Sequence, residues 1–401
     1  RPYRHGTRAG RHRVRRADHL GDRGPSAPIN WPAPFRRRAH ALVSLAADTE
    51  ADLDAMVNEQ SVLAGRFGAI VIWTQRGATR SDEPGHEHFG FKDGISQPGI
   101  RGVTTPSDPA NPDQGIPGQD LLWPGEFVIG HPGQGGVGQP ITSPGPRSVS
   151  GPAWTTNGSY LVFRRLRQDV AGFRAFVERT AAQQGISTDL MGAKLMGRYK
   201  SGAALEATGA RAVDPGASDP SLLSDAKVND FEYADDPNGA VVPLGSHIRK
   251  TYPRDEPTHE GGEADTQTHR ILRRGIPFGT SLPAGAPADD PAAIASYPND
   301  RGLLFACYQS SIRRQFEFIQ NHWVNNDRFP RPDSGQDPVV SQTTTPGSFT
   351  LPGGRPDHVA LMQRFVTTTG GDYFFAPSIT ALAMLAQPLP RPPKPARRPP
   401  R

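Results

Sequence analysis

Two short strips of the sequence combine a titratable side chain with neighbours that could fix its direction. In residues 90–98, GFKDGISQP, Asp93 precedes a glycine, and this pair is a turn signal because glycine tolerates a left-handed backbone. The strip could be a plain turn, or the turn could aim the Asp93 carboxylate into a cavity as an acid–base group. In residues 243–250, PLGSHIRK, His247 could be a hydrogen-bonded core histidine. It could also present a neutral imidazole nitrogen to a metal or a haem iron.

A third strip, HRILRRGIPFG at residues 269–279, places Arg273 and Arg274 before a turn sequence. Taken alone, two adjacent arginines are most often a solvated surface. His86 and His88 have an H-x-H spacing that can chelate zinc. No cysteine cluster and no H-E-x-x-H motif supplies the remaining ligands, so the sequence argues against a zinc site.

The elements that must position these strips follow a repeated strand–helix pattern. Residues 41–47 (ALVSLAA) and 69–74 (AIVIWT) predict two strands. Between them, Thr49 and Asp52 form a capping signal for a helix that ends near Gly65. Together these segments predict a β-α-β unit.

The pattern returns twice later in the chain. Residues 159–166 predict a strand, followed by a helix that stops near Gly185. Residues 303–308 predict another strand, followed by a helix that presents apolar side chains at helical spacing. Those side chains are Ile312, Phe316, Ile319 and Trp323. Three such units predict an α+β fold, a duplicated sandwich in which helices cover antiparallel sheets. Residues 104–154, 204–240 and 326–356 are expected to be mostly loop.

Composition narrows the class of protein. The chain has 401 residues, 35% of them hydrophobic, with 44 Gly and 42 Pro, which suits packed elements joined by long connections. No apolar stretch approaches the roughly 20 residues that cross a bilayer, and no signal peptide is visible. Cys307 is the one cysteine, so no intramolecular disulfide can form. The net charge is +5, and both ends are rich in arginine and predict disordered arms.

Taken together and in this order, the three strips resemble the dye-decolorizing peroxidase family. GFKDGISQP resembles the G-x-x-D-G signature, PLGSHIRKTYPRD the strip with the proximal histidine, and HRILRRGIPFG the strip with the distal arginine. NGSYLVFRRLRQDV, GLLFACYQSSI and GGDYFFAPS are similar to further segments in the expected order. The likeness spans residues 40–385 and is greatest to the larger fungal and actinobacterial members.

The resemblance implies two ferredoxin-like halves with one haem b per chain between them. It implies that His247 is the axial ligand of the iron and that Asp93 and Arg273 act on bound hydrogen peroxide. Leu303 and Phe305 would be the apolar residues that limit the peroxide pocket. The implied activity is oxidation of aromatic dyes and phenols through an oxoferryl intermediate. The proximal imidazole of the family is often hydrogen-bonded to a carboxylate, for which Glu317 and Asp372 are the candidates here.

The resemblance also divides the chain. We expect residues 1–36 to be an atypical basic segment that could form a disordered arm. Its first part, RPYRHGTRAGRHRVRRADHLGDRG, resembles no expected first strand. Residues 37–150 are the expected N-terminal half with the Asp93 strip. Residues 151–387 are the expected haem-binding half, and residues 388–401 a disordered tail rich in Pro and Arg. The sequence leaves the compartment open between the cytoplasm and export with the signal already removed.

Two other functions compete with peroxidase activity. One is a haem-handling protein of the same fold with little or no catalysis. The other is a basic protein whose arms bind polyanions, although no specific nucleic acid or membrane partner is expected. The joint presence of Asp93, His247 and Arg273 favours the enzyme, because a binding module needs no such combination. Since a closed pocket would exclude a bulky dye, a redox-active aromatic is expected to relay electrons, and Trp323 is the first choice.

Overall fold

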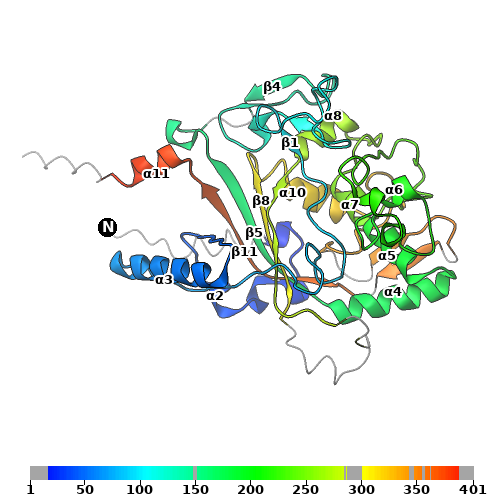
Figure 1. Cartoon of the computed structure of the whole chain (residues 1–401), viewed down its shortest axis with the longest axis horizontal. Coiled ribbons are helices and arrows are strands. Elements are labelled where there is room, and N and C mark those ends of the chain that lie inside the picture. The colour runs from blue at the N-terminus through cyan, green and yellow to red at the C-terminus, as the bar shows by residue number, and fades with distance from the viewer. Residues whose placement is uncertain are drawn as a thin grey trace, which may run out of the picture.

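The computed structural model describes residues 17–147, 151–283, 286, 300–342, 347–354, 357–361 and 363–387. Within them, five strands form one antiparallel sheet (Figure 1). Its order is β11 (Val366–Ala376), β5 (Ser159–Gln168), β8 (Gly302–Gln309) and β6 (Leu272–Arg273), with β7 (Ile276–Phe278) also paired to β8. The strands predicted over residues 159–166 and 303–308 are therefore confirmed, and the α+β class with them.

Register decides which side chains of this sheet share a face. Arg164 of β5 lies opposite Phe305 of β8, and Leu166 lies opposite Leu303. Because neighbours along a strand point to opposite faces, these four side chains project from the same face. Thr368 of β11 joins them, because it pairs with Leu166.

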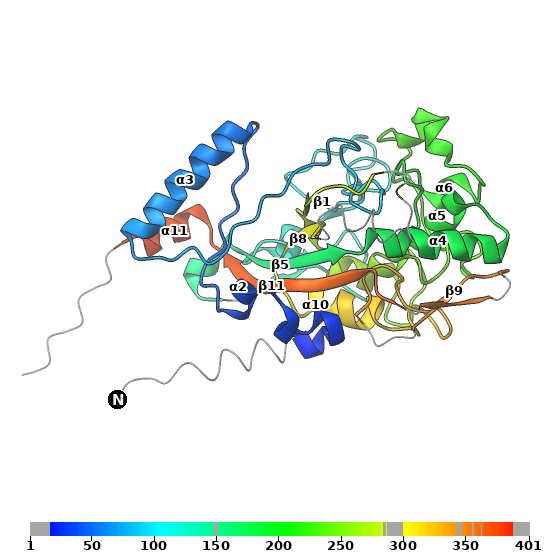
Figure 2. The ribbon, with the colours of Figure 1, turned by 90° about the horizontal axis from the view of Figure 1, so that it is seen from below.

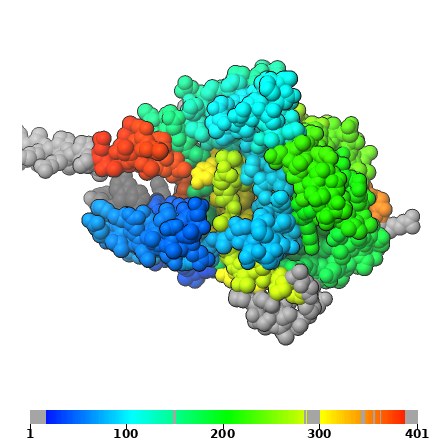
Figure 3. Space-filling model, in the orientation of Figure 1, coloured from blue at the N-terminus to red at the C-terminus, as the bar shows by residue number. Residues whose placement is uncertain are grey.

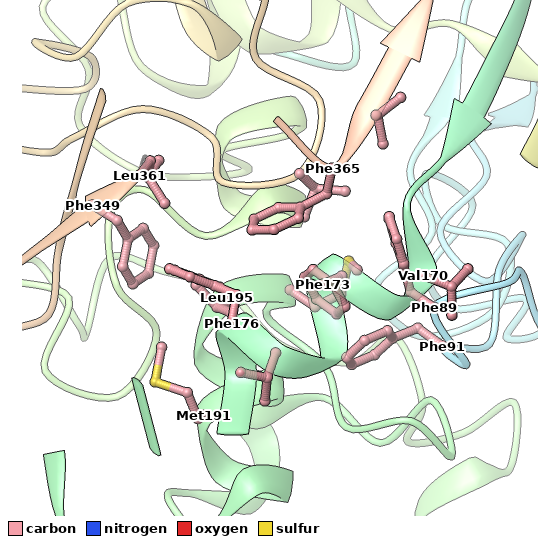
Figure 4. Packing of buried hydrophobic residues seen from close by; sticks show 14 of the residues in the cluster. Phe89, Phe91, Val170, Phe173, Phe176, Met191, Leu195, Phe349, Leu361 and Phe365 are labelled. Carbon is pink, nitrogen blue, oxygen red and sulfur yellow. The ribbon is translucent and has the colours of Figure 1, made fainter. Parts of the chain in front are cut away.

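Helix α4 (Val170–Gln184) follows β5 and closes one end of this sheet. The Asp169 side chain caps its first turn by accepting from the Gly172 N–H, and Gly185 ends it in the left-handed conformation. Its buried face carries Phe173 and Phe176, which pack on Phe365 with ring centroids 5.4 and 5.1 Å apart (Figure 4). The helix is as predicted, and α5 (Thr188–Met196) packs beside it.

The rest of the described chain is built from short elements joined by loops, as the high Gly and Pro content predicts. The short helices are α2 (Ala33–Arg36), α6 (Leu205–Thr208), α7 (His247–Thr251), α8 (Glu263–Thr266) and α11 (Ile379–Leu385). Two-stranded pairs are formed by β1 (Gly99–Ile100) with β2 (Leu121–Leu122), β3 (Pro132–Gln134) with β4 (Pro144–Arg147), and β9 (Gly347–Thr350) with β10 (His358–Leu361). Single turns of 3-10 helix are η1 (Gly24–Ser26), η2 (Pro28–Asn30), η3 (Pro124–Glu126), η4 (Ala153–Thr155), η5 (Pro215–Ala217), η6 (Pro220–Leu223) and η7 (Gln267–His269).

The first predicted β-α-β unit is only partly correct. Helix α3 (Glu50–Arg66) forms as predicted, with the Thr49 side chain accepting from the Asp52 N–H. The strands predicted over residues 41–47 and 69–74 are wrong, because both segments lack strand structure. A strand needs a neighbour for its backbone groups, and neither segment pairs with another strand in the described chain. Helices α3 and α11 project at the same end of the molecule, away from α4 and α5 (Figures 1, 2 and 3).

The helix predicted after residues 303–308 is shorter and less regular than expected. It consists of α10 (Phe316–Phe318) and a π-helical turn, η8 (Ile319–Val324), so Ile312 lies outside it. Gln315 interrupts the pattern with a non-helical backbone. Its side-chain amide accepts from the Ser311 N–H and donates to the Glu126 carbonyl, so local side-chain hydrogen bonds compete with the helix.

Residues 17–36 are packed, so the expectation of a disordered arm over residues 1–36 is wrong for this part. The carboxylate of Asp22 accepts from both terminal nitrogens of Arg164, at 2.9 and 2.6 Å, and both side chains are buried. Trp31 is buried and its indole N–H donates to the Ser26 carbonyl at 2.9 Å. The buried ion pair between Asp22 and Arg164 holds this segment against the sheet. Residues 1–16 and the expected tail at 388–401 lie outside the described residues.

Among the described residues, no helix has both the length and the apolar character that crossing a membrane requires.

Replacing Asp22 with Ala should destabilise the fold by about 3–5 kcal/mol, because it leaves the Arg164 guanidinium buried without its counter-charge. The free energy of unfolding from denaturant titration measures this. Asp54→Ala is the matched control, since Asp54 pairs with Arg76 on an exposed surface and should cost no more than about 1 kcal/mol. Equal losses in the two variants would show that Asp22 does not stabilise a buried charge.

Candidate active site

One face of the five-stranded sheet borders a cavity of about 250 Å³. Its lining also includes the strip around Asp93 and α7, which begins at His247. The three strips singled out in the sequence therefore meet at one cavity. The sheet contributes Arg164, Leu166, Gln168, Leu303, Phe305, Val366 and Thr368 to its lining.

His247 is fixed through one of its two ring nitrogens. Nδ1 lies 2.8 Å from Oδ2 of Asp337, whose side chain is completely buried. The other oxygen, Oδ1, accepts from the backbone N–H groups of Val339 and Val340 at 2.7 and 2.9 Å. Burial lowers the pKa of His247, but the Asp337 carboxylate outweighs it, and the pKa stands above its ordinary value. Nε2 is the ring nitrogen left to bind a ligand in the cavity.

The carboxylate beside His247 is thus neither Glu317 nor Asp372, the two candidates drawn from the sequence. Asp337 lies in the loop over residues 326–356, which has no residue pattern that marks a partner for His247. Its position depends on how that loop folds back on α7, which the sequence pattern does not encode. One clue was available in principle: a lone Asp followed by the apolar pair Val339 and Val340 suits a buried turn.

Asp93 and Arg273 form an ion pair across 180 residues of sequence. Nη1 of Arg273 donates to Oδ1 of Asp93 at 2.9 Å, and both side chains are about one third exposed. The N–H of Gly94, which has a φ of 82°, donates to the same oxygen at 2.6 Å. Burial raises the pKa of Asp93, but the Arg273 charge and the Gly94 N–H outweigh it and hold the pKa below its ordinary value. This carboxylate is therefore ionised at mildly acidic pH.

Leu303 and Phe305 both border the cavity from β8. Phe305 is braced by Phe316, whose ring centroid lies 6.0 Å away. Lys92 and Ile95, the variable residues of the first strip, also border the cavity.

A further group of polar residues borders the cavity and was not foreseen from the sequence. Arg198 and Arg254 are buried and both donate to Oδ1 of Asn229, at 3.1 and 2.8 Å. Arg198 bonds to neutral oxygens and to no carboxylate of the described residues. Burial, followed by the charge of Arg254, lowers the pKa of Arg198 to about 9. The hydroxyl of Tyr233 is buried and has no hydrogen-bond partner in the described structure.

Other residues considered from the sequence have no role at the cavity. Nε2 of His86 bonds the Lys200 carbonyl and Nε2 of His88 the Phe278 carbonyl. No cluster of metal-ligating side chains is found in the part of the chain that the structure describes. Trp323 is buried, stacks on Phe329 and donates from its indole nitrogen to Glu260 at 2.9 Å, so no dye can touch it directly in this conformation.

Comparison with known proteins shows the family of this chain. The sequence model of the family described as "Dyp-type peroxidase, C-terminal" matches residues 147–355. Peroxidase 2 of Mycetinis scorodonius is 34% identical over 91% of this chain and 69% of its own length. The dye-decolorizing peroxidase of Exidia glandulosa is 34% identical over 88% of this chain and 66% of its own length. The chain belongs to the dye-decolorizing peroxidase family.

A solved dye-decolorizing peroxidase in complex with 2,6-dimethoxyphenol superposes with a TM-score of 0.70. It is 30% identical, and the match covers 92% of this chain and 78% of that one. The resemblance read from the three strips is thereby confirmed. Like its structural neighbours, this chain has a two-domain ferredoxin-like α+β fold, and it is an enzyme that depends on haem.

Asp337→Asn should remove the cause of the raised pKa of His247. In the haem-free chain, a raised pKa stabilises the fold below the ordinary value of about 6.5, and this contribution is lost as the pH rises through the folded pKa. The free energy of unfolding should therefore differ most between wild type and variant below pH 6.5, with a smaller gap at higher pH. Denaturant titration across pH measures it. A gap that widens as the pH rises would contradict the assigned ion pair.

Proposed function

We propose that this chain is a haem peroxidase that uses hydrogen peroxide to oxidise aromatic dyes, phenols and similar reductants, with one haem b per chain. The observation that carries the proposal is a single cavity shared by an imidazole backed by a carboxylate and by an ion-paired carboxylate and guanidinium. The first pair, His247 and Asp337, suits an axial ligand, and the second, Asp93 and Arg273, suits acid–base work on peroxide. The phenol in the related complex supports the choice of reductant.

The residues of the cavity fit a haem. Nδ1 of His247 is engaged by Asp337, so Nε2 is the nitrogen that would bind the iron. Arg198, Arg254 and the free hydroxyl of Tyr233 suit the carboxylates that haem b carries. When bound, haem supplies an iron with an open position that cleaves the O–O bond and passes electrons singly.

The proposed halves of the chain meet at this cavity. Residues 37–150 would form the N-terminal half, which contributes Asp93, and residues 151–387 the C-terminal half, which contributes His247 and Arg273. The match of the family's C-terminal model to residues 147–355 supports this boundary.

Asp93 would move the proton that peroxide cleavage requires. Its ionised carboxylate would accept a proton from one oxygen of peroxide and return it to the other, so that the second oxygen can leave as water. Arg273 stays protonated at any working pH and stabilises the negative charge that develops as the bond breaks. The Arg273 charge also keeps the pKa of Asp93 low, so the proton acceptor is ready at mildly acidic pH.

Leu303 and Phe305 would limit the space beside this pair to a molecule as small as peroxide. Larger reductants would then donate their electrons at the protein surface. The relay through Trp323 stays a prediction, and the burial of its indole requires a neighbouring exposed group to meet the dye.

A haem-handling protein of the same fold is the alternative. It would need the His247 pair but not a distal acid and cation, so the contact between Asp93 and Arg273 favours the peroxidase. Polyanion binding by the basic ends concerns residues that the structure does not describe.

Arg273→Leu should leave haem binding intact and slow the reaction with peroxide by roughly 100- to 1000-fold, the loss seen when one preorganised charge donor is removed. Rapid mixing of the haem-loaded protein with peroxide measures the rate. Arg274→Leu is the matched control, since the neighbouring Arg274 is exposed and does not border the cavity. Equal rates in wild type and Arg273→Leu would contradict the proposed function.

Asp93→Asn should abolish the proton transfer and change the pH dependence of the peroxide reaction. Because the pKa of Asp93 lies below its ordinary value, the carboxylate stays ionised and the wild type should keep its rate at mildly acidic pH. The amide has no such titration, so the variant should be slow and lack the acidic limb set by Asp93. An identical rate–pH profile in the two proteins would show that Asp93 is a turn residue only.

A further inference from the structure

One side chain links the two strips that carry Asp93 and Arg273. Gln97, four residues after Asp93, places its amide group against the backbone of Arg273. Its Oε1 accepts from the Arg273 N–H at 3.1 Å, and its Nε2 donates to the Arg273 carbonyl at 3.0 Å. A single planar amide thus satisfies both backbone groups of one residue from a segment 176 positions away.

The backbone of Arg273 needs such a partner because β6 lies at the edge of the sheet. Arg273 pairs in register with Cys307 of β8, but the hydrogen bond to β8 comes from the next residue, where the Arg274 N–H donates to the Ala306 carbonyl at 2.7 Å. Backbone groups alternate in direction along a strand, so those of Arg273 face away from β8. Gln97 completes the ladder there, in place of another strand.

The ion pair alone is a weak link between the strips. Both side chains are about one third exposed, and an exposed pair contributes little because water screens it. Asp93 is anchored by the segment that precedes its strip, since its N–H donates to the Gly85 carbonyl at 3.0 Å. Apart from the ion pair, the Arg273 guanidinium reaches this strip only through a 3.4 Å bond to the Ser96 carbonyl, among the described residues. The two hydrogen bonds of Gln97, at 3.0 and 3.1 Å, are shorter than the bond to Ser96, and they join the Arg273 backbone to the strip.

We propose that Gln97 is a positioning residue for the peroxide reaction: its amide fixes the Arg273 backbone so that the guanidinium meets Asp93 in the cavity. The proposal rests on the proposed function for its consequence in catalysis, but the contact itself can be tested separately. Gln is suited to the place because its head carries both a donor and an acceptor. Met has the same length and neither bond, and Glu keeps only the acceptor for the N–H.

The test compares Gln97→Met with wild type, both loaded with haem. Hydrogen exchange at the Arg273 amide should be about tenfold faster in the variant, because its N–H has lost its acceptor. Fluoride, an anion that binds ferric iron beside the distal cation, should bind about tenfold more weakly, because the guanidinium is no longer held in place. Gln119→Leu is the matched control, since Gln119 donates to the Gln97 carbonyl and does not contact Arg273. It should leave both measurements as in wild type.

Gln97→Glu separates the hydrogen bond from packing and covers the case in which Gln97→Met does not retain haem. It should keep the Arg273 amide protected, because the acceptor remains. Exchange as slow in Gln97→Met as in wild type, or equally fast in Gln97→Met and Gln97→Glu, overturns the proposal. Arg273→Leu measured with fluoride tests the function independently. If that variant binds fluoride as tightly as wild type does, the proposed role of Arg273 is contradicted. The exchange data would still test whether Gln97 holds the Arg273 backbone.

Discussion

The alternation of side chains along β5 and β8 is the constraint on which the cavity depends. Arg164 and Leu166 share a face with Phe305 and Leu303 because the two strands pair in this register. A shift of one residue would turn the side chains of one strand to the opposite face and replace them in this wall with their neighbours. The register is held on both sides of β5, because β11 pairs with its other edge from Ser159 to Gln168, with one irregularity between Thr368 and Gly370. Because β5 is paired on both sides, a shift in its register would disrupt its pairing with two strands, which suits a wall that must stay fixed.

Charges buried near this wall are compensated by partners from distant segments. Asp22 reaches Arg164 from the N-terminal segment, and Asp337 reaches His247 from a long loop. Each pair costs desolvation, so its geometry matters more for specificity than for net stability. Such pairs do fix where the segments lie, because a misplaced segment would leave a buried charge alone. The loops of this protein are thereby ordered by a few ionic contacts rather than by regular secondary structure.

The sequence predicted what short-range patterns determine. The strip with Asp93, the capped helix after Thr49 and the helix ended by Gly185 follow from local rules, and the structure has both helices. Asp337 could not be found this way, because its role depends on a loop that returns to α7 after 90 residues. The strands expected over residues 41–47 and 69–74 failed for a related reason, since β-branched residues favour a strand only where a neighbour supplies the ladder.

Burying the polar side chains of Arg198, Arg254 and Tyr233 at the cavity costs the protein free energy. Arg198 is buried among neutral oxygens beside Arg254, and the lowering of its pKa to about 9 expresses that cost. The buried Tyr233 hydroxyl adds a donor without an acceptor. A ligand with carboxylates beside these groups would supply the missing acceptors and charge. Since such a ligand binds the folded chain and not the unfolded one, its binding free energy adds to stability. These groups would therefore favour a ligand with carboxylates, as haem b has, over an uncharged molecule of similar size.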